Sequence, residues 1–384
     1  MAASLFRSVY GWSALATYAG FIYVEQLSVS ADMKWMVFSA NTGPDKLDID
    51  RRHIVRVPVD KAAMEVITTG SELETYPVIT GDGATIALLS ASAQRPLLPA
   101  VMASTKGTLK LIGQEHIPAA FPTNQLVTPK QVIFKAPDGT NVHGQLFEPA
   151  GGRSKHAAIV YVHGGPQRQM VLGWHFMDYY SIDYALNQYL VSLGFSVLSV
   201  NYRMGTGYGY EFNRPPHAGA AGASEYQDIK AAGEWLASQQ SIDKEKIGIY
   251  GGSYGGFLTA LGLGRDSKLF AAGVDIHGVH NRTRTPSDRG EHAPDEELAA
   301  KVAWQSSPIA YVDTWTSPVL IIHADDDRNV PFSQSVDLVR RFEDKGFPFE
   351  YLAIPDDTHH WMKNANALKV SEATAEFLKR KLMK

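Results

Sequence analysis

The chain has 384 residues, of which 45% are hydrophobic, so it is long enough for one large domain and a smaller one with a substantial buried core. Its net charge of −4 lacks the basic surplus of a nucleic-acid binder, and we therefore exclude nucleic acid as a partner. The absence of cysteine excludes disulfides, thiolate nucleophiles and cysteine-based zinc sites, and it fits a reducing cytoplasm without excluding export.

An uncharged segment, residues 8–24, follows Arg7 near the N-terminus. A signal peptide or a membrane anchor is one interpretation of this segment. Its Gly, Ser, Thr and Tyr residues and its lack of a leucine-rich core favour a buried strand pair instead. No other stretch has the length needed to cross a bilayer. We therefore expect a cytoplasmic protein that does not insert into a membrane.

The first 125 residues are predicted to form β structure, because short apolar runs alternate with turn residues. The clearest runs are residues 35–38, 53–57 and 85–89. A weak repeat relates residues 31–35 to residues 81–85, so that Asp32 and Asp82 stand 50 positions apart, and this period suits propeller blades. With only two copies visible, chance similarity stays an alternative.

Beyond residue 125 the pattern changes. A turn at residues 137–139 separates apolar runs at residues 132–134 and 142–146, which predicts a hairpin. Strand and helix patterns then alternate to the C-terminus. The strands are residues 157–162, 196–201, 247–250, 319–323 and 351–354, and the helices are residues 180–193, 225–238, 257–263, 333–345 and 367–381. The alternation predicts an α/β domain over residues 126–384, with a mostly parallel sheet and helices on both faces.

The sequence Gly-Gly-Ser-Tyr-Gly at residues 251–255 fits the G-x-S-x-G motif. It follows a short apolar strand and precedes a helical run, and this context gives the motif its value. A tight strand-to-helix turn requires glycines beside the serine and holds the Oγ of Ser253 exposed next to a helix N-terminus. Ser253 is therefore predicted to be the nucleophile of a serine hydrolase with the α/β-hydrolase fold. The alternative is a glycine-rich turn without chemistry.

Serine needs a base to take its proton, and in this fold the acid and then the histidine follow the serine in chain order. Two polar clusters come directly after the predicted strands at residues 319–323 and 351–354, at the sheet edge where catalytic groups gather. Spacing alone does not choose between the members of each cluster. The candidates are Asp325, Asp326 and Asp327 in the first cluster, and His359 and His360 in the second.

The same two clusters can also be interpreted as a metal site. The possible ligands are His323, Asp325 and Asp327 in the first cluster, and His359 and His360 in the second. No helical H-x-x-x-H or comparable ligand spacing supports that interpretation. We therefore predict that the protein binds no metal and no cofactor.

Six short motifs lie between residues 163 and 359. They are His-Gly-Gly-Pro at 163–166, Asn-Tyr-Arg at 201–203 with Gly-Thr-Gly-Tyr-Gly at 205–209, Glu-Tyr-Gln-Asp at 225–228, Gly-Gly-Ser-Tyr-Gly-Gly at 251–256, Asp-Arg-Asn-Val-Pro at 327–331, and Pro-Asp-Asp-Thr-His at 355–359. Together they resemble the prolyl oligopeptidase family of serine peptidases, and most closely its acylaminoacyl-peptidase and dipeptidyl-aminopeptidase branch. The resemblance implies that Asp327 is the acid and His359 the base, although His360 stands where the family usually has glycine.

The resemblance also implies hydrolysis through an acyl-enzyme formed on Ser253. The backbone N–H of Tyr254 is expected to be one oxyanion donor. The second is expected from His163, Gly164 or Gly165, because relatives with a tyrosine at the position of His163 use its phenol. We therefore predict cleavage of peptide, acyl-peptide or small ester bonds.

Family members carry seven or eight propeller blades before the hydrolase domain, whereas residues 1–125 have room for only two or three. We interpret this region as a truncated β-propeller that acts as a cap or as the surface of a homo-oligomer. An open site favours small esters, so a carboxylesterase with little or no peptidase activity is the main alternative. An inactive binding protein is a further alternative, against which the intact Ser253, Asp327 and His359 argue.

Overall fold

The computed structural model describes residues 22–151, 155–283 and 295–383. Most of the uncharged N-terminal segment, residues 8–21, lies outside the described residues, and none of the described helices is long and apolar enough to cross a membrane. The chain divides into two compact units. The first consists of Met1–Pro129, Val171–Ser181 and Thr206–Tyr210. The boundary predicted at residue 125 lies close to the end of its longest segment, but two later segments also belong to this unit.

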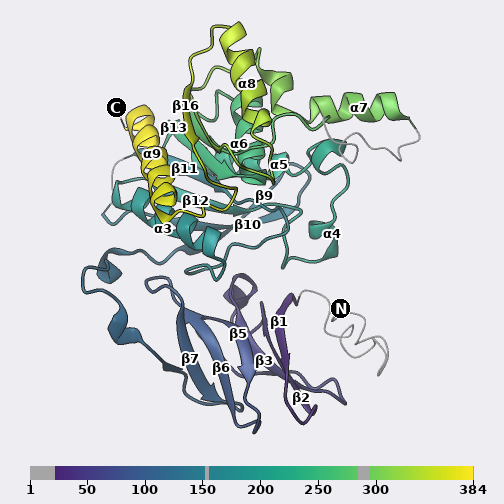
Figure 1. Cartoon of the computed structure of the whole chain (residues 1–384), viewed down its shortest axis with the longest axis vertical. Helices are drawn as coiled ribbons and strands as arrows, with labels where there is room; N and C mark the ends of the chain where they lie inside the picture. The colour runs from purple at the N-terminus through teal and green to yellow at the C-terminus, as the bar shows by residue number, and fades with distance from the viewer. Residues whose placement is uncertain (1–21, 152–154, 284–294, 384) are drawn as a thin grey trace. The chain divides into compact units, whose positions relative to one another are not determined.

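The first unit is built on two four-stranded antiparallel sheets (Figure 1). One sheet contains β1 (Val24–Val29), β2 (Trp35–Ala40), β3 (His53–Pro58) and β4 (Glu65–Val66), and the other contains β5 (Leu73–Ile79), β6 (Thr85–Ala91), β7 (Leu98–Ala103) and β8 (Lys110–Leu111). Short 3₁₀ helices are η1 (Lys46–Asp50), η2 (Gln114–His116) and η3 (Thr123–Gln125). Apolar side chains from both sheets, such as Val37, Ile54 and Ile86, are buried in one core. The β structure predicted for this region is therefore confirmed.

The two sheets repeat the same backbone details 50 positions apart. The first strand of each sheet has a register shift, and it contains a residue with positive φ, Gln26 at 51° in β1 and Tyr76 at 52° in β5. In the turn that follows, Asp32 accepts a hydrogen bond from the hydroxyl two residues earlier at 2.7 Å, and Asp82 accepts the matching bond at 2.6 Å. Such a short-range bond closes the turn locally. The repeat predicted from the sequence is thus confirmed, and each sheet resembles one propeller blade.

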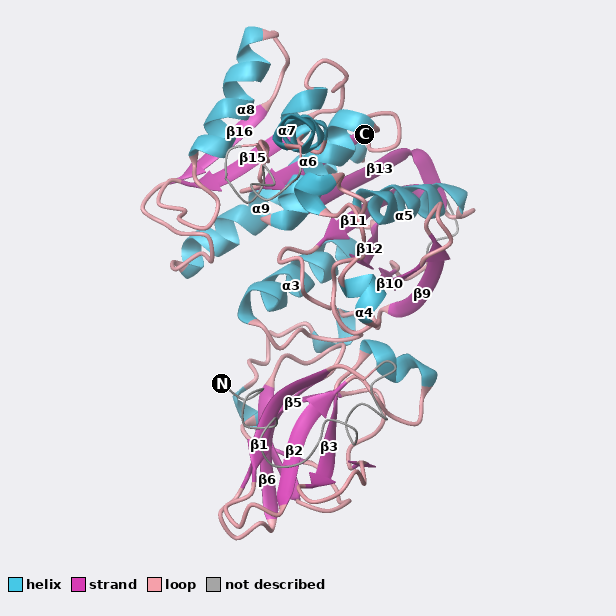
Figure 2. Cartoon of the chain, turned by 90° about the vertical axis from the view of Figure 1, so that its right-hand side faces the viewer, coloured by secondary structure: helices cyan, strands magenta, loops and turns pink. Residues whose placement is uncertain are grey.

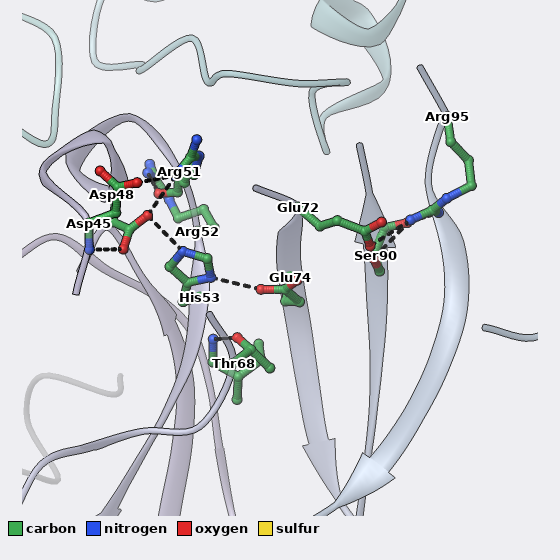
Figure 3. A network of polar contacts seen from close by, with 11 residues as sticks. Asp45, Asp48, Arg51, Arg52, His53, Thr68, Glu72, Glu74, Ser90 and Arg95 are labelled. Carbon is green, nitrogen blue, oxygen red and sulfur yellow. Dashed lines mark hydrogen bonds and ion pairs between the residues drawn. The ribbon is translucent and has the colours of Figure 1, made fainter. Parts of the chain in front are cut away.

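A network of buried polar side chains joins the two sheets of this unit (Figure 3). His53 of β3 is fully buried, with Nδ1 2.9 Å from Oε2 of Glu74 on β5 and Nε2 3.1 Å from Oδ1 of Asp48 in η1. Burial alone would lower the pKa of His53, but the two carboxylates outweigh it and raise the pKa. Arg51 pairs with Asp48 at 3.0 Å. The network therefore links the two sheets through ion pairs, although Nε2 of His53 and Nε of Arg51 form no hydrogen bond among the described residues.

The second unit contains one eight-stranded sheet, in the order β16-β15-β14-β13-β11-β12-β10-β9. Its strands are β9 (Lys130–Lys135), β10 (Asn141–Phe147), β11 (His156–Val162), β12 (Ser196–Asn201), β13 (Ile242–Gly252), β14 (Ala272–Ile276), β15 (Val319–Ala324) and β16 (Glu350–Ile354). Neighbouring strands pair in parallel along the series β12-β11-β13-β14-β15-β16. At the other end of the sheet, β9 and β10 form the predicted antiparallel hairpin, and β10 pairs antiparallel with β12. The sequence did not predict β14, because Gly273 and Asp275 interrupt its apolar pattern.

Helices cover both faces of this sheet (Figure 2). They are α3 (Asp178–Ser192), α4 (Tyr210–Asn213), α5 (Tyr226–Ser238), α6 (Tyr254–Arg265), α7 (Glu296–Gln305), α8 (Ser333–Asp344) and α9 (Asn364–Leu382), with the 3₁₀ helices η4 (Gly219–Ala221) and η5 (Pro308–Tyr311). Neighbouring residues of β13 point to opposite faces. Tyr250 donates to Asn187 of α3 at 2.7 Å and Gly248 lies against α9, whereas Ile249 lies against Gly262 of α6. The face of α6 also carries α5 and α8, whose apolar residues share its core.

Candidate active site

Ser253 lies in the turn between β13 and α6, at the carboxyl edge of the sheet. Its φ of 58° and ψ of −118° lie in a region that residues other than glycine rarely adopt. Its backbone N–H donates to the carbonyl of Ile276 at 2.9 Å. A Cβ atom at Gly251 or Gly255 would overlap the carbonyl oxygen of Val162. The motif therefore requires both glycines for close backbone packing, and the resulting turn leaves Ser253 half-buried.

The carboxylate of Asp327, in the loop after β15, accepts hydrogen bonds at both oxygens. Nδ1 of His359 donates to Oδ2 at 2.6 Å, and Nε2 of His323 lies 3.3 Å from the same oxygen. The N–H groups of Asn329 and Val330 donate to Oδ1, each at 2.9 Å. Burial alone would raise the pKa of Asp327, but the bonds from His323 and His359 hold it well below its usual range. Asp327 is therefore an anion held in one orientation.

The other candidates in the two clusters have different partners. Asp325 accepts a backbone N–H from the loop after β16 at 2.8 Å, and Asp326 forms an exposed ion pair. His360 is exposed, and its ring lies 5.2 Å from the ring of His359 and nearly perpendicular to it. This geometry supports Asp327 and His359 over their neighbours, while their catalytic roles stay predictions.

Ser253 and His359 both lie against the short segment at residues 276–277. Ser253 bonds to the carbonyl of Ile276, and the ring of the next residue, His277, lies 4.2 Å from the ring of His359 with a tilt of 31°. Within the described part of the chain, no hydrogen bond joins Oγ of Ser253 to Nε2 of His359. Catalytic hydrogen bonds are often long without substrate and tighten in the complex. The structure therefore brings the base to the segment that supports the nucleophile.

Two histidines beside the predicted triad were not recognised from the sequence in this role. His277 is fully buried, and His323 entered the sequence analysis only as a possible metal ligand. His323 bonds to Val330 through Nε2 at 3.0 Å and to Ser335 through Nδ1 at 2.7 Å. His277 follows β14, so predicting that strand would have placed it at the same carboxyl edge as the other two clusters.

The predicted oxyanion residues follow β11 and begin α6. Nδ1 of His163 donates to the carbonyl of Gly164 at 2.7 Å, and its ring stacks on Tyr202 with the ring centroids 4.4 Å apart. Burial lowers the pKa of His163 to about 4, so its ring is neutral. The Nδ1–H is therefore already used within the loop. This favours the N–H groups of Gly164 and Gly165 over the imidazole as donors, together with Tyr254, because N–H groups point out of the helix end there.

Residues of two further motifs, at 201–203 and 225–228, form buried polar contacts near this edge of the sheet. Arg203 pairs with the buried Asp228 and with Asp138, each at 2.6 Å. Burial alone would lower the pKa of Arg203, but the two carboxylates raise it. Glu225 is fully buried and accepts a hydrogen bond from the hydroxyl of Tyr254 at 2.7 Å. Glu225 thus holds the residue that directly follows Ser253.

By distance alone, His277, Asp327 and His359 form a group that could hold a metal ion, since one ligand atom of each lies within 4.8 Å of the others. The ring of His277 lies over the ring of His359, however, with the centroids 4.2 Å apart and an angle of 31°. Nδ1 of His359 is also bonded to Asp327. This arrangement does not suit a tetrahedral ion. The absence of a metal or cofactor stays a prediction.

Comparison with known proteins places these features among characterised relatives. The model of the "Prolyl oligopeptidase family" matches residues 181–384, just over half of the chain. The chain is 30% identical to dipeptidyl aminopeptidase BIII of Pseudoxanthomonas mexicana over 233 residues, which is 57% of this chain and 32% of that protein. It is 24% identical to the acylamino-acid-releasing enzyme of Mus musculus over 358 residues, which is 86% of this chain and 46% of that protein. The chain thus spans 32% to 46% of the length of these curated relatives.

Solved structures have the same fold. The acylaminoacyl peptidase of Pyrococcus horikoshii superposes with a TM-score of 0.78 at 21% identity, over 95% of this chain and 57% of that chain. A puromycin-hydrolyzing peptidase of Mycobacterium tuberculosis gives a TM-score of 0.74 at 21% identity, over 94% and 55%. At this level of identity the likeness shows the fold alone. It confirms the predicted class, an α/β-hydrolase domain preceded by propeller-like β structure.

Proposed function

The chain belongs to the prolyl oligopeptidase family, and from this premise we propose that it is a serine hydrolase that cleaves peptide, acyl-peptide or small ester bonds. One observation carries the proposal. A histidine bonded to a buried carboxylate at 2.6 Å lies against the same segment as a serine that a strand-to-helix turn holds at a φ of 58°. This combination provides a nucleophile, a base and an orienting anion at one sheet edge.

In the proposed first step, Oγ of Ser253 attacks the carbonyl carbon of the substrate while Nε2 of His359 takes the hydroxyl proton. The Nδ1–H of His359 already donates to Asp327, which fixes the ring tautomer so that Nε2 is the proton acceptor. The tetrahedral intermediate then expels the amine or alcohol, which leaves with the proton from His359. Water attacks the acyl-enzyme by the same route and releases the acid and the free serine.

The negative charge on the intermediate requires hydrogen-bond donors. We assign these to the N–H of Tyr254 and to the N–H groups of Gly164 and Gly165. The proposed donors come from the N-terminus of α6 and from the loop after β11, the strand that pairs with β13. Loss of one such donor typically lowers the rate by on the order of 10²–10³-fold.

The names of the curated relatives support peptides with a free or acylated N-terminus as substrates. Their full-length chains are much longer than this one, so the bond that this chain prefers is a proposal. A serine triad cleaves an activated ester more readily than an amide, because the alkoxide is the better leaving group. The carboxylesterase therefore remains the second candidate and becomes one outcome of the test.

The test compares turnover of a nitrophenyl ester with turnover of aminoacyl- and acylaminoacyl-nitroanilides, and adds labelling by a fluorophosphonate probe. We expect labelling at Ser253 and measurable cleavage of both substrate types, and Ser253→Ala should abolish labelling and cleavage. Ester cleavage without anilide cleavage would support the carboxylesterase instead of the peptidase. A folded protein that the probe does not label would contradict the proposal and support a binding protein.

The compartment and the assembly state belong to this proposal as well. We expect the protein to act in the cytoplasm, because a chain without cysteine suits a reducing compartment. Cell fractionation tests this expectation. Its partners are expected to be a short peptide or small ester and, in a homo-oligomer, a second copy of the chain, with no nucleic acid and no membrane. Size-exclusion chromatography with light scattering tests the assembly state.

A further inference from the structure

The ring of His359 is held at its edge and at its face by different residues. Asp327 accepts the Nδ1–H at the edge, and His277 stacks on the face with the ring centroids 4.2 Å apart. Trp361 stacks on His277 in turn, with the centroids 5.1 Å apart and an angle of 28°. The hydrogen bond alone allows His359 to rotate about the Nδ1–Oδ2 direction. The stack opposes this rotation, because turning the ring would lose its contact with His277.

The segment that carries His277 is itself fixed. The N–H of His277 donates to the carbonyl of Ile322 in β15 at 2.7 Å, and the residue has a positive φ of 40°. Three residues later, His280 bonds to Asp275 through Nε2 at 2.5 Å and to the carbonyl of Gln334 through Nδ1 at 3.0 Å. Both of its nitrogens therefore donate, which makes His280 a cation paired with Asp275. A buried ion pair and a strand-to-strand bond thus hold the stacking ring in place.

The charge state of His277 suits this role. Burial, followed by the nearby His359 and His323, lowers its pKa well below the usual value. His277 is therefore neutral while His359 gains and loses its proton. This neutral ring adds no second positive charge beside His359 when His359 holds the proton of Ser253.

We propose that His277 is a positioning residue of this site, whose buried ring sets the orientation in which His359 takes the proton of Ser253. The proposal rests on the proposed function for its kinetic consequences only, because the contact between the rings of His277 and His359 can be measured without turnover. Asp327, His277 and His360 lie against the ring of His359, and His323 shares the Oδ2 of Asp327 with it. Of these side chains, His277 lies over the face of the ring.

The test uses two variants that differ in whether the ring is kept. His277→Phe retains a neutral aromatic face, whereas His277→Leu fills the space without one. We expect His277→Phe to keep kcat/KM within about threefold and His277→Leu to lower it by about 10–100-fold, since small displacements of a catalytic group have effects of this size. Rates are divided by the concentration of sites that the fluorophosphonate titrates, so that unfolded protein does not enter the comparison.

The second readout is the split between kcat and KM. The fall in His277→Leu should lie in kcat, with KM unchanged within about threefold, because His277 orients the base and does not bind the substrate. Imidazole NMR in the Ser253→Ala background shows without turnover whether the ring of His359 keeps one orientation in each variant. An orientation lost in His277→Leu and kept in His277→Phe, in a protein whose wild type shows no activity, would support the ring contact and contradict the proposed function.

Two results would overturn the inference. One is wild-type kcat/KM in His277→Leu. The other is an equal fall in kcat/KM for both variants while NMR shows the His359 ring in its wild-type orientation, since that result describes a packing residue and not an orienting ring. Thermal unfolding of both variants shows whether such an equal fall follows a loss of stability.

Discussion

The two units each bury a histidine against a carboxylate, and the two pairs differ at the second ring nitrogen. In the α/β unit, Nδ1 of His359 lies 2.6 Å from Asp327, and the described residues place no hydrogen-bond partner on Nε2. In the β unit, Nδ1 of His53 lies 2.9 Å from Glu74, and Nε2 faces a second carboxylate at 3.1 Å. The first histidine can accept a proton from another group, whereas the second has a carboxylate oxygen within 3.1 Å of each ring nitrogen.

This difference shows that a histidine–carboxylate pair does not by itself indicate catalysis. The pair in the β unit is an ion pair that joins two sheets (Figure 3). The pair in the α/β unit lies at the edge where parallel strands end and where the chain turns sharply at Ser253. The surroundings of the second nitrogen decide whether the same two side chains stabilise a fold or transfer a proton.

The largest expected effect on activity comes from replacing the carboxylate beside the histidine by an amide, and the same replacement is made in both pairs. Asp327→Asn should lower kcat by about 10⁴-fold, because the amide no longer fixes the tautomer of His359 or stabilises its cation. Glu74→Gln makes the equivalent change beside His53 and should leave kcat within about threefold of wild type, because this pair joins two sheets and is not part of the proposed triad. Steady-state kinetics on a nitrophenyl ester measure both. Equal losses in the two variants would remove the distinction drawn between the pairs.

The next effect concerns stability. Arg203→Met leaves the buried Asp228 without its cation, and breaking such a pair costs about 3–5 kcal/mol in the free energy of unfolding. In the β unit, Arg56 pairs with Glu65 at 2.7 Å at a partly exposed position, so Arg56→Met should cost about 1 kcal/mol or less. Urea unfolding monitored by circular dichroism gives both values. Similar losses would show that burial does not separate these two pairs.

We expect the stability of the protein to depend on pH through His53 of the β unit. The pKa of His53 is raised above its usual value, so its stabilising effect is complete below the ordinary histidine pKa of about 6.5 and is lost as pH rises through the raised value. We expect the unfolding temperature of the wild type to fall more between neutral and mildly alkaline pH than that of His53→Gln. Differential scanning calorimetry at several pH values measures the difference. Parallel curves for the two proteins would show that His53 does not titrate as an ion-pair partner.

The smallest expected effect compares the two sheets of the β unit. Asp32→Ala and Asp82→Ala each remove an exposed turn bond, and the two turns have matching geometry. Both variants should lower the unfolding temperature slightly and to the same extent. The two measurements use the same calorimeter and buffer. Clearly different falls in unfolding temperature would show that the two turns have the same geometry but contribute differently to stability.

The features that could be predicted from the sequence are those encoded in neighbouring residues. The turn at Ser253 was predictable because glycines beside a serine, between an apolar strand and a helical run, are typical of a sharp turn that exposes a nucleophile. The clusters around Asp327 and His359 were predictable because each directly follows an apolar strand. The repeat at Asp32 and Asp82 was visible because both turns use the same short-range bond.

The features that were not predictable depend on residues far apart in the chain. The stack of His277 on His359 requires β14 to be recognised, and the glycine and aspartate inside that strand hide its apolar pattern. Spacing alone did not choose Asp327 over its two neighbours, because the choice depends on which carboxylate reaches a loop more than thirty residues away, and only the family resemblance supplied it. The ring of His163 turns onto Tyr202, and no local pattern indicates that contact.

The matching bulges and turns of the two sheets have a consequence for how such chains vary. Each sheet closes its own turn, but the two strand bends are coupled, because Oε1 of Gln26 in β1 accepts the N–H of Tyr76 in β5 at 3.2 Å. In tandem architectures of this kind, stability is approximately the sum of the contribution of each copy and of its interface with the next. Loss of one sheet would therefore remove its own contribution and also the bond that supports the bend of the other.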